Sequence, residues 1–105
     1  KLISVADIGD VRPGKAEIYS TIKGETPECY EIEIVKVTGQ SQKDDKGLVV
    51  RVIDSRLLDE TGGIVQGMSG SPIVQNGKLV GAVTHVFIND PTRGFGMFAK
   101  WMLTE

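Results

Sequence analysis

The sequence has little of what metal and redox sites are built from. Its 105 residues include one cysteine, one histidine and one tryptophan. The single cysteine, Cys29, excludes an internal disulfide, and no cysteine-protease signature surrounds it. One histidine and one cysteine do not make a set of metal ligands. We therefore expect no metal and no other cofactor, and no catalytic role for Cys29.

Long apolar runs and an excess of basic charge are also missing. No stretch approaches the roughly 20 apolar residues that a membrane-spanning helix needs, and no signal peptide is recognisable. The formal net charge is -2, so the chain lacks the basic patch that phosphate binding requires, and we expect no nucleic-acid partner. The chain begins at Lys1 without a methionine, which fits a processed product or a piece of a longer protein.

Glycine, in contrast, is abundant, with 13 residues against the roughly 7% of an average protein. Many glycines with short periodic runs indicate tight turns and short strands. Apolar and polar residues alternate over 16–22 and 30–37, as in half-buried strands, and a short β-branched strand is expected over 48–53. We expect one all-β unit: a small antiparallel barrel, or half of a larger one, with short helical turns.

Turn signals separate the expected strands. Asn76-Gly77 accepts positive φ at both central positions of a type I′ turn, which predicts a hairpin of strands 72–75 and 78–83. Asp54 or Ser55 is expected to cap a helical turn within 54–60, which Gly62-Gly63 then ends. The pattern further predicts a connecting turn over 23–28, an exposed loop over 39–47, a strand over 95–98 and a short helix over 99–103.

One segment has the features of a nucleophilic site: Gly67-Met68-Ser69-Gly70-Ser71-Pro72. Its glycines allow backbone conformations that other residues resist. Such a turn can expose the Ser69 hydroxyl while the N–H groups of Gly67 and Ser69 converge as an oxyanion hole. A Gly/Ser-rich turn without chemistry has the same short motif. The longer string, with its hairpin and returning strand, is similar to the active-serine region of chymotrypsin-like peptidases.

Segments 61–72 and 81–87 together resemble the SpoIVB-type sporulation protease family. Segments 89–92 and 101–103 fit the same family, and 13–18 and 32–35 fit it more loosely. The resemblance implies a secreted serine peptidase of endospore-forming bacteria, exported to the space between mother cell and forespore. There it would cleave a membrane-anchored regulator and so release processing of a sigma-factor precursor.

The resemblance also implies how the domain is divided. Residues 1–105 correspond to the C-terminal, chymotrypsin-like portion of the peptidase domain, and the family's base histidine lies upstream of them. The missing N-terminal half would then be a partner of this chain. Without its base, the chain alone is expected to be nearly inactive, since removal of a triad member leaves only residual rate enhancement.

His85 and Asp54 are the candidate partners of Ser69 within the chain. In the chymotrypsin-like order the base precedes the serine, whereas His85 follows it. The resemblance places Thr84, His85 and Val86 on the strand that lines the substrate cleft. Three roles stay open for His85: general base, part of the cleft wall, or packing alone. Asp54 is the family's candidate acid, but an ordinary helix N-cap explains it equally well.

Two further interpretations stay open. A non-catalytic β module would bind extended peptides by adding a strand at an open sheet edge. A half-barrel would expose unpaired edges and associate with itself. Met68 is a departure from chymotrypsin-like zymogens, which often carry an aspartate there. We therefore expect that no N-terminal ammonium is needed to organise the oxyanion hole.

Overall fold

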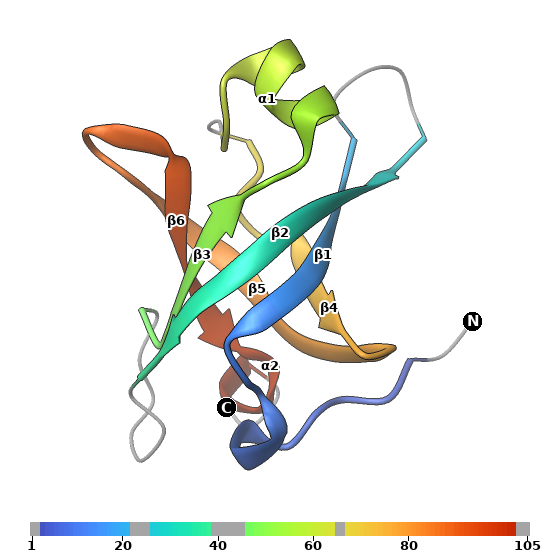
Figure 1. The fold of residues 1–105 in the computed structure, drawn as a ribbon. Helices are drawn as coiled ribbons and strands as arrows, with labels where there is room; N and C mark the ends of the chain where they lie inside the picture. Colours follow the sequence, from blue (N-terminus) through green and yellow to red (C-terminus); the bar gives the residue numbers. More distant parts are fainter. Residues whose placement is uncertain (1–2, 22–25, 39–45, 65–66, 103–105) are drawn as a thin grey trace.

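A computed structural model describes residues 3–21, 26–38, 46–64 and 67–102. Six antiparallel strands close into a barrel in the order β1-β2-β3-β6-β5-β4 (Figure 1). The expected small antiparallel barrel with short helical turns is therefore confirmed. The strands are β1 (Gly14–Ser20), β2 (Glu28–Val37), β3 (Leu48–Val52), β4 (Pro72–Gln75), β5 (Lys78–Phe87) and β6 (Asp90–Phe98), and the helices are η1 (Ile8–Asp10), α1 (Ser55–Thr61) and α2 (Ala99–Met102).

Alternation along the strands creates the core. Ile18, Ile32, Ile34 and Val50 point into the barrel and are fully buried, while their polar neighbours face outward. Burial of an aliphatic side chain of this size contributes roughly 1.5–3 kcal/mol relative to leaving it exposed. In the described part of the chain, no helix is both long and apolar enough to span a membrane.

Glycines bring β5 and β6 close together. A Cβ at Gly94 would lie 2.8 Å from the His85 carbonyl oxygen, and one at Gly96 would lie 3.0 Å from that of Ala82. Both positions face the barrel interior, where Ile64 and other core side chains fill the space instead. Phe95, between the two glycines, therefore turns its ring to the outer face.

The hairpin at Asn76-Gly77 forms as expected, with φ of 54° and 77° at the two residues. The following strand is longer than expected, because β5 continues to Phe87. The strand predicted over 95–98 begins five residues earlier, at Asp90. The predicted loop over 39–47 lies largely outside the described residues, as do residues 23–25 of the turn predicted over 23–28 and the last residue of the helix predicted over 99–103.

The barrel closes through a short seam. β1 and β4 share only two residue pairs, Glu17 with Val74 and Ile18 with Ile73. The next residue of β4 toward Ser69 is Pro72, which has no N–H to donate. The ladder therefore stops where the Ser69 segment begins.

The strand directions gather the candidate site residues at one end of the barrel, which we call the α1 end. β1, β3 and β5 finish there, and β2, β4 and β6 start there. Figure 1 shows α1 and the connection into β4 at this end. Asp54 follows β3, Ser69 precedes β4, and His85 lies near the end of β5, so all three belong to the same end.

Candidate active site

Ser69 is exposed and is held against the returning strand β5. Its Oγ donates a hydrogen bond to the carbonyl oxygen of Thr84 over 3.2 Å. The next residue, Gly70, donates its N–H to the Val83 carbonyl over 2.7 Å. These two bonds fix the serine beside the strand that the sequence predicts as the wall of a substrate cleft.

The turn around Ser69 has a buried methionine and a glycine with positive φ on each side of the Met68-Ser69 pair. Met68 is 2% exposed, and its carbonyl accepts the Ser71 N–H over 3.0 Å. Gly67 and Gly70 have φ of 99° and 90°, values that favour glycine. Within the described part of the chain, neither the Gly67 nor the Ser69 N–H donates a hydrogen bond to the protein. Both are therefore available to a substrate oxygen, although the predicted oxyanion hole stays a prediction.

The connection from α1 to Ser69 is fastened to β6. α1 ends at Thr61, and its C-cap Gly62 is left-handed. Ile64 donates its N–H to the Pro91 carbonyl over 2.7 Å. A Cβ on Gly63 would lie 2.2 Å from that same carbonyl oxygen. Only glycine fits at this position. The Gly62-Gly63 pair, which the sequence predicts to end the helix, therefore also lets this segment pack against β6.

His85 is exposed on β5 and pairs with Phe95 of β6. Thr84 lies where the ladder shifts register between Val83 and His85, and its carbonyl, not the imidazole, accepts the Ser69 hydroxyl. The strand thus runs directly beside the serine. The wall, base and packing roles of His85 all stay predictions.

Two cavities border the serine and its strand. One, of about 420 Å³, is lined on β5 and β6 by residues that include His85, Val86 and Phe95. The other, of about 460 Å³, lies between residues 19–21 with Pro27 and the loop residues Gly67 and 70–72. Neither lining includes Ser69 itself, so the cavities adjoin its loop neighbours and the strand β5 beside it.

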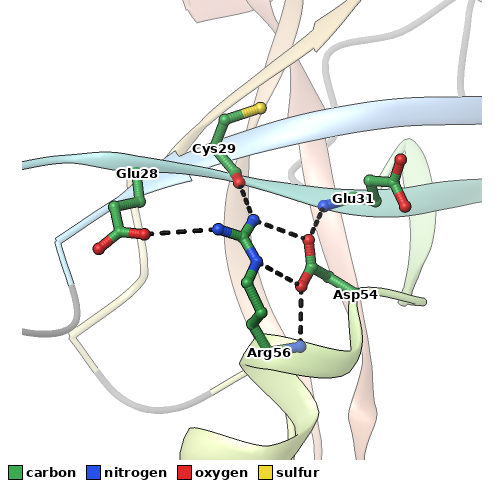
Figure 2. Close-up of polar contacts among 5 residues, drawn as sticks. All are labelled: Glu28, Cys29, Glu31, Asp54 and Arg56. Carbon is green, nitrogen blue, oxygen red and sulfur yellow. Dashed lines mark hydrogen bonds and ion pairs between the residues drawn. The ribbon is translucent and has the colours of Figure 1, made fainter.

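Asp54 caps α1, as predicted, and accepts four hydrogen bonds (Figure 2). Its Oδ1 accepts from the N and Nε of Arg56 at 2.9 and 3.2 Å. Its Oδ2 accepts from the Glu31 N at 3.0 Å and from Arg56 Nη2 at 3.1 Å. The Arg56 side chain, helped by both backbone N–H groups and opposed by burial, lowers the pKa of Asp54 to about 2. The carboxylate is therefore charged and fully engaged.

Arg56 ties the start of α1 to β2. Figure 2 shows its guanidinium between Asp54 and Glu28, with the Cys29 carbonyl above it. Nη2 donates to that carbonyl over 2.6 Å, and Nη1 lies 3.5 Å from the Glu28 carboxylate. The guanidinium carbon also lies 5.0 Å from the centroid of the Tyr30 ring, a cation–π distance.

The SpoIVB peptidase S55 family model matches residues 1–103. The chain belongs to this family. No curated protein and no solved structure matches it. Family membership confirms the resemblance to SpoIVB-type peptidases over nearly the whole chain and supports a peptidase.

In this SpoIVB-family chain the two catalytic candidates occupy different surroundings. Asp54 lines a cavity of about 590 Å³ together with Glu17, Cys29 and Arg56, and this cavity shares no residue with the two that border Ser69 or its strand. The catalytic roles of Asp54 and Ser69 stay predictions. Sequence reasoning missed the part that Arg56 plays, although an arginine two residues after a helix-capping aspartate is a signal that points to it.

Proposed function

We propose that this SpoIVB-family chain carries the nucleophile of a serine endopeptidase. Ser69 Oγ attacks a substrate carbonyl, the peptide C–N bond breaks, and the amine leaves with a proton. Water then hydrolyses the acyl-enzyme and restores the hydroxyl. The observation that carries the proposal is the exposed Ser69 hydroxyl beside the N–H groups of Gly67 and Ser69, neither of which donates a hydrogen bond to another described residue. Such donors stabilise the oxyanion that forms during attack.

The base is proposed to come from outside these residues. The Ser69 hydroxyl donates to a backbone carbonyl, which orients it but cannot remove its proton. A serine needs a general base within hydrogen-bond reach. The family resemblance supplies an upstream histidine, and Asp54 is carried forward as the candidate acid that would orient it.

The substrate is proposed to be an extended peptide that runs along Thr84, His85 and Val86. The resemblance alone supports its identity as a membrane-anchored regulator whose cleavage releases processing of a sigma-factor precursor. It alone supports export to the space between mother cell and forespore. The strand-addition module, the alternative function, needs an open sheet edge, and the closure of the described strands into a barrel gives it no support.

Fluorophosphonate labelling with peptide mapping tests the nucleophile. The 105-residue chain is compared with a form extended upstream through the family's histidine, each with Ser69→Ala and, as a control, Ser71→Ala. We expect labelling of Ser69 in the extended form only, abolished by Ser69→Ala. Labelling of the short chain would make His85 the base, and no labelling in either form would favour the binding module.

Asp54→Asn in the extended form separates the two roles of this residue. Asparagine still caps a helix but cannot stabilise an imidazolium, and loss of that charge costs on the order of 10⁴ in rate in a triad. A fall of that size in a folded protein would identify an acid. Unchanged labelling would leave Asp54 as a cap.

A further inference from the structure

We propose that the cavity on the outer face of the β5–β6 hairpin is a subsite for an apolar, preferably aromatic, side chain of the peptide held at Ser69. We call it the β5–β6 subsite. Its lining includes Lys46, His85, Phe87, Ile88, Asp90 and Phe95, and its volume is about 420 Å³. The inference rests on the proposed function and adds the class of side chain that the site selects.

Two phenylalanine rings form the apolar floor of the subsite. Phe87 and Phe95 stack with centroids 4.6 Å apart and planes 26° from parallel. The inward-facing glycines on either side of Phe95 force its ring outward, where it is only half-buried. The β5–β6 hairpin therefore presents an aromatic surface to solvent instead of burying it in the core.

Ile88 extends this apolar surface. Its side chain sits at the tip of the hairpin and is 96% exposed, which leaves a large aliphatic group in water beside the two rings. Removing such apolar area from water is favourable, and an aromatic ring adds favourable offset or edge-to-face geometry with Phe87 and Phe95.

The charged groups at the rim favour an apolar occupant over a basic one. The Asp90 carboxylate is already engaged by the Thr92 N–H at 3.1 Å and by Arg93 Nε at 3.2 Å. Lys46 places its Nζ 5.3 Å from the Phe95 centroid, so an ammonium group already lies over the ring that a basic side chain would have to contact. A lysine or arginine of the substrate would have to share that ring with another cation, and both carboxylate oxygens of Asp90 already have partners.

The subsite lies further along β5 from the residue that contacts Ser69. Thr84 accepts the Ser69 hydroxyl, and His85, the next residue of β5, already lines the cavity. A strand advances about 3.3 Å per residue, so the stretch from His85 to Ile88 lies within about 15 Å of Thr84. An extended peptide passing Ser69 along β5 reaches this surface with a side chain about two to four residues from the bond to be cut.

The test is an NMR titration of the ¹⁵N-labelled chain with peptides Ac-Gly-Gly-X-Ala-Ala-Gly-NH₂, where X is Phe, Leu, Glu, Lys or Ala. We expect the Phe peptide to shift the amide signals of His85, Phe87, Ile88 and Phe95 and to bind at least about tenfold more tightly than the Ala peptide. Ile88→Ser should weaken binding of the Phe peptide about fivefold. The matched control is Val35→Ser, which removes an exposed apolar side chain, 44% exposed, from β2 and should leave binding unchanged.

Each other outcome overturns the proposal. Tightest binding of the Glu peptide would show that Lys46 recognises the side chain and that the subsite prefers acidic residues. Shifts confined to residues 19–21 and 70–72 would place the side chain in the other cavity. Labelling of Ser69 in the upstream-extended protein without any X-dependent binding would overturn the subsite and leave the peptidase. X-dependent binding without labelling would overturn the nucleophile and, with it, the assignment of this cavity as a subsite of a peptidase.

Discussion

At the scale of single residues, Asp54 joins three parts of the barrel. Its carboxylate accepts two backbone N–H groups, from Glu31 of β2 and from Arg56 of α1, and two donors of the Arg56 guanidinium. Hydrogen bonds to an ionised group are stronger than neutral ones, and a buried donor left without its acceptor is costly. The carboxylate thus contributes to stability whatever it does in catalysis.

Asp54→Ala should destabilise the chain by about 2–4 kcal/mol, because it removes the cap of α1 and strands the Glu31 N–H. Asp54→Asn keeps a capping oxygen and should cost less, about 1–2 kcal/mol. Urea denaturation followed by circular dichroism measures both. Asp59→Ala, on the exposed face of the same helix, is the control and should change stability by less than about 0.5 kcal/mol. Equal losses at positions 54 and 59 would show that the network does not stabilise the fold.

The same carboxylate makes stability depend on acid. The pKa of Asp54 is about 2 in the folded chain against an ordinary value of 3.8. A depressed folded pKa means that the contribution is complete above pH 3.8 and is lost as the pH falls toward 2. We expect the urea midpoint to fall over this window, and to fall less in Asp54→Asn, which has no proton to take up. Parallel pH curves for the two proteins would contradict the assignment.

At the scale of elements, the features that depend only on residues close in sequence were predicted correctly. Asn76-Gly77 and its hairpin, the alternation in β1 and β2, and the cap at Asp54 depend on neighbouring residues only, and all three are confirmed. β6 was placed five residues too late, because Pro91 and the two glycines at 94 and 96 weaken a strand pattern. The glycines are needed for tertiary packing, because they leave space for the β5 backbone and for core side chains. No local sequence pattern indicates that requirement.

Gly63→Ala should loosen the connection between α1 and Ser69. The added Cβ would meet the Pro91 carbonyl oxygen at 2.2 Å, and φ at this residue is 141°, so we expect a loss of about 2–4 kcal/mol from clash and strain. Differential scanning calorimetry measures it. Gly9→Ala is the control, because its Cβ would meet nothing within 4 Å and its φ is not positive. An unchanged melting temperature for Gly63→Ala would mean that the Ile64–Pro91 contact does not anchor this segment.

At the scale of the whole molecule, the sequence predicted a small barrel but not which strands close it. Closure depends on two pairs between β1 and β4, whose residues lie more than fifty positions apart. For the site, the Ser69 motif and its strand were predictable because the hairpin brings them together. The Arg56 contacts with β2 and the stacked rings of Phe87 and Phe95 were not, because they follow from how separate elements pack.

The closed barrel leads to a prediction about association. Self-association was one open interpretation, on the premise of unpaired strand edges, but each of the six described strands has a neighbour on both sides. Sedimentation velocity of the isolated chain at about 10–100 μM should therefore show one species near 11.4 kDa, independent of concentration, since none of the strands that the structure describes is left without a neighbour to drive assembly. The shortest strand pairing in the barrel is the two-residue seam between β1 and β4, so a second chain should pair with the sheet there if it pairs at all. A concentration-dependent dimer whose hydrogen-exchange protection rises at residues 17–19 and 72–74 would reverse the prediction and identify that seam as an interface.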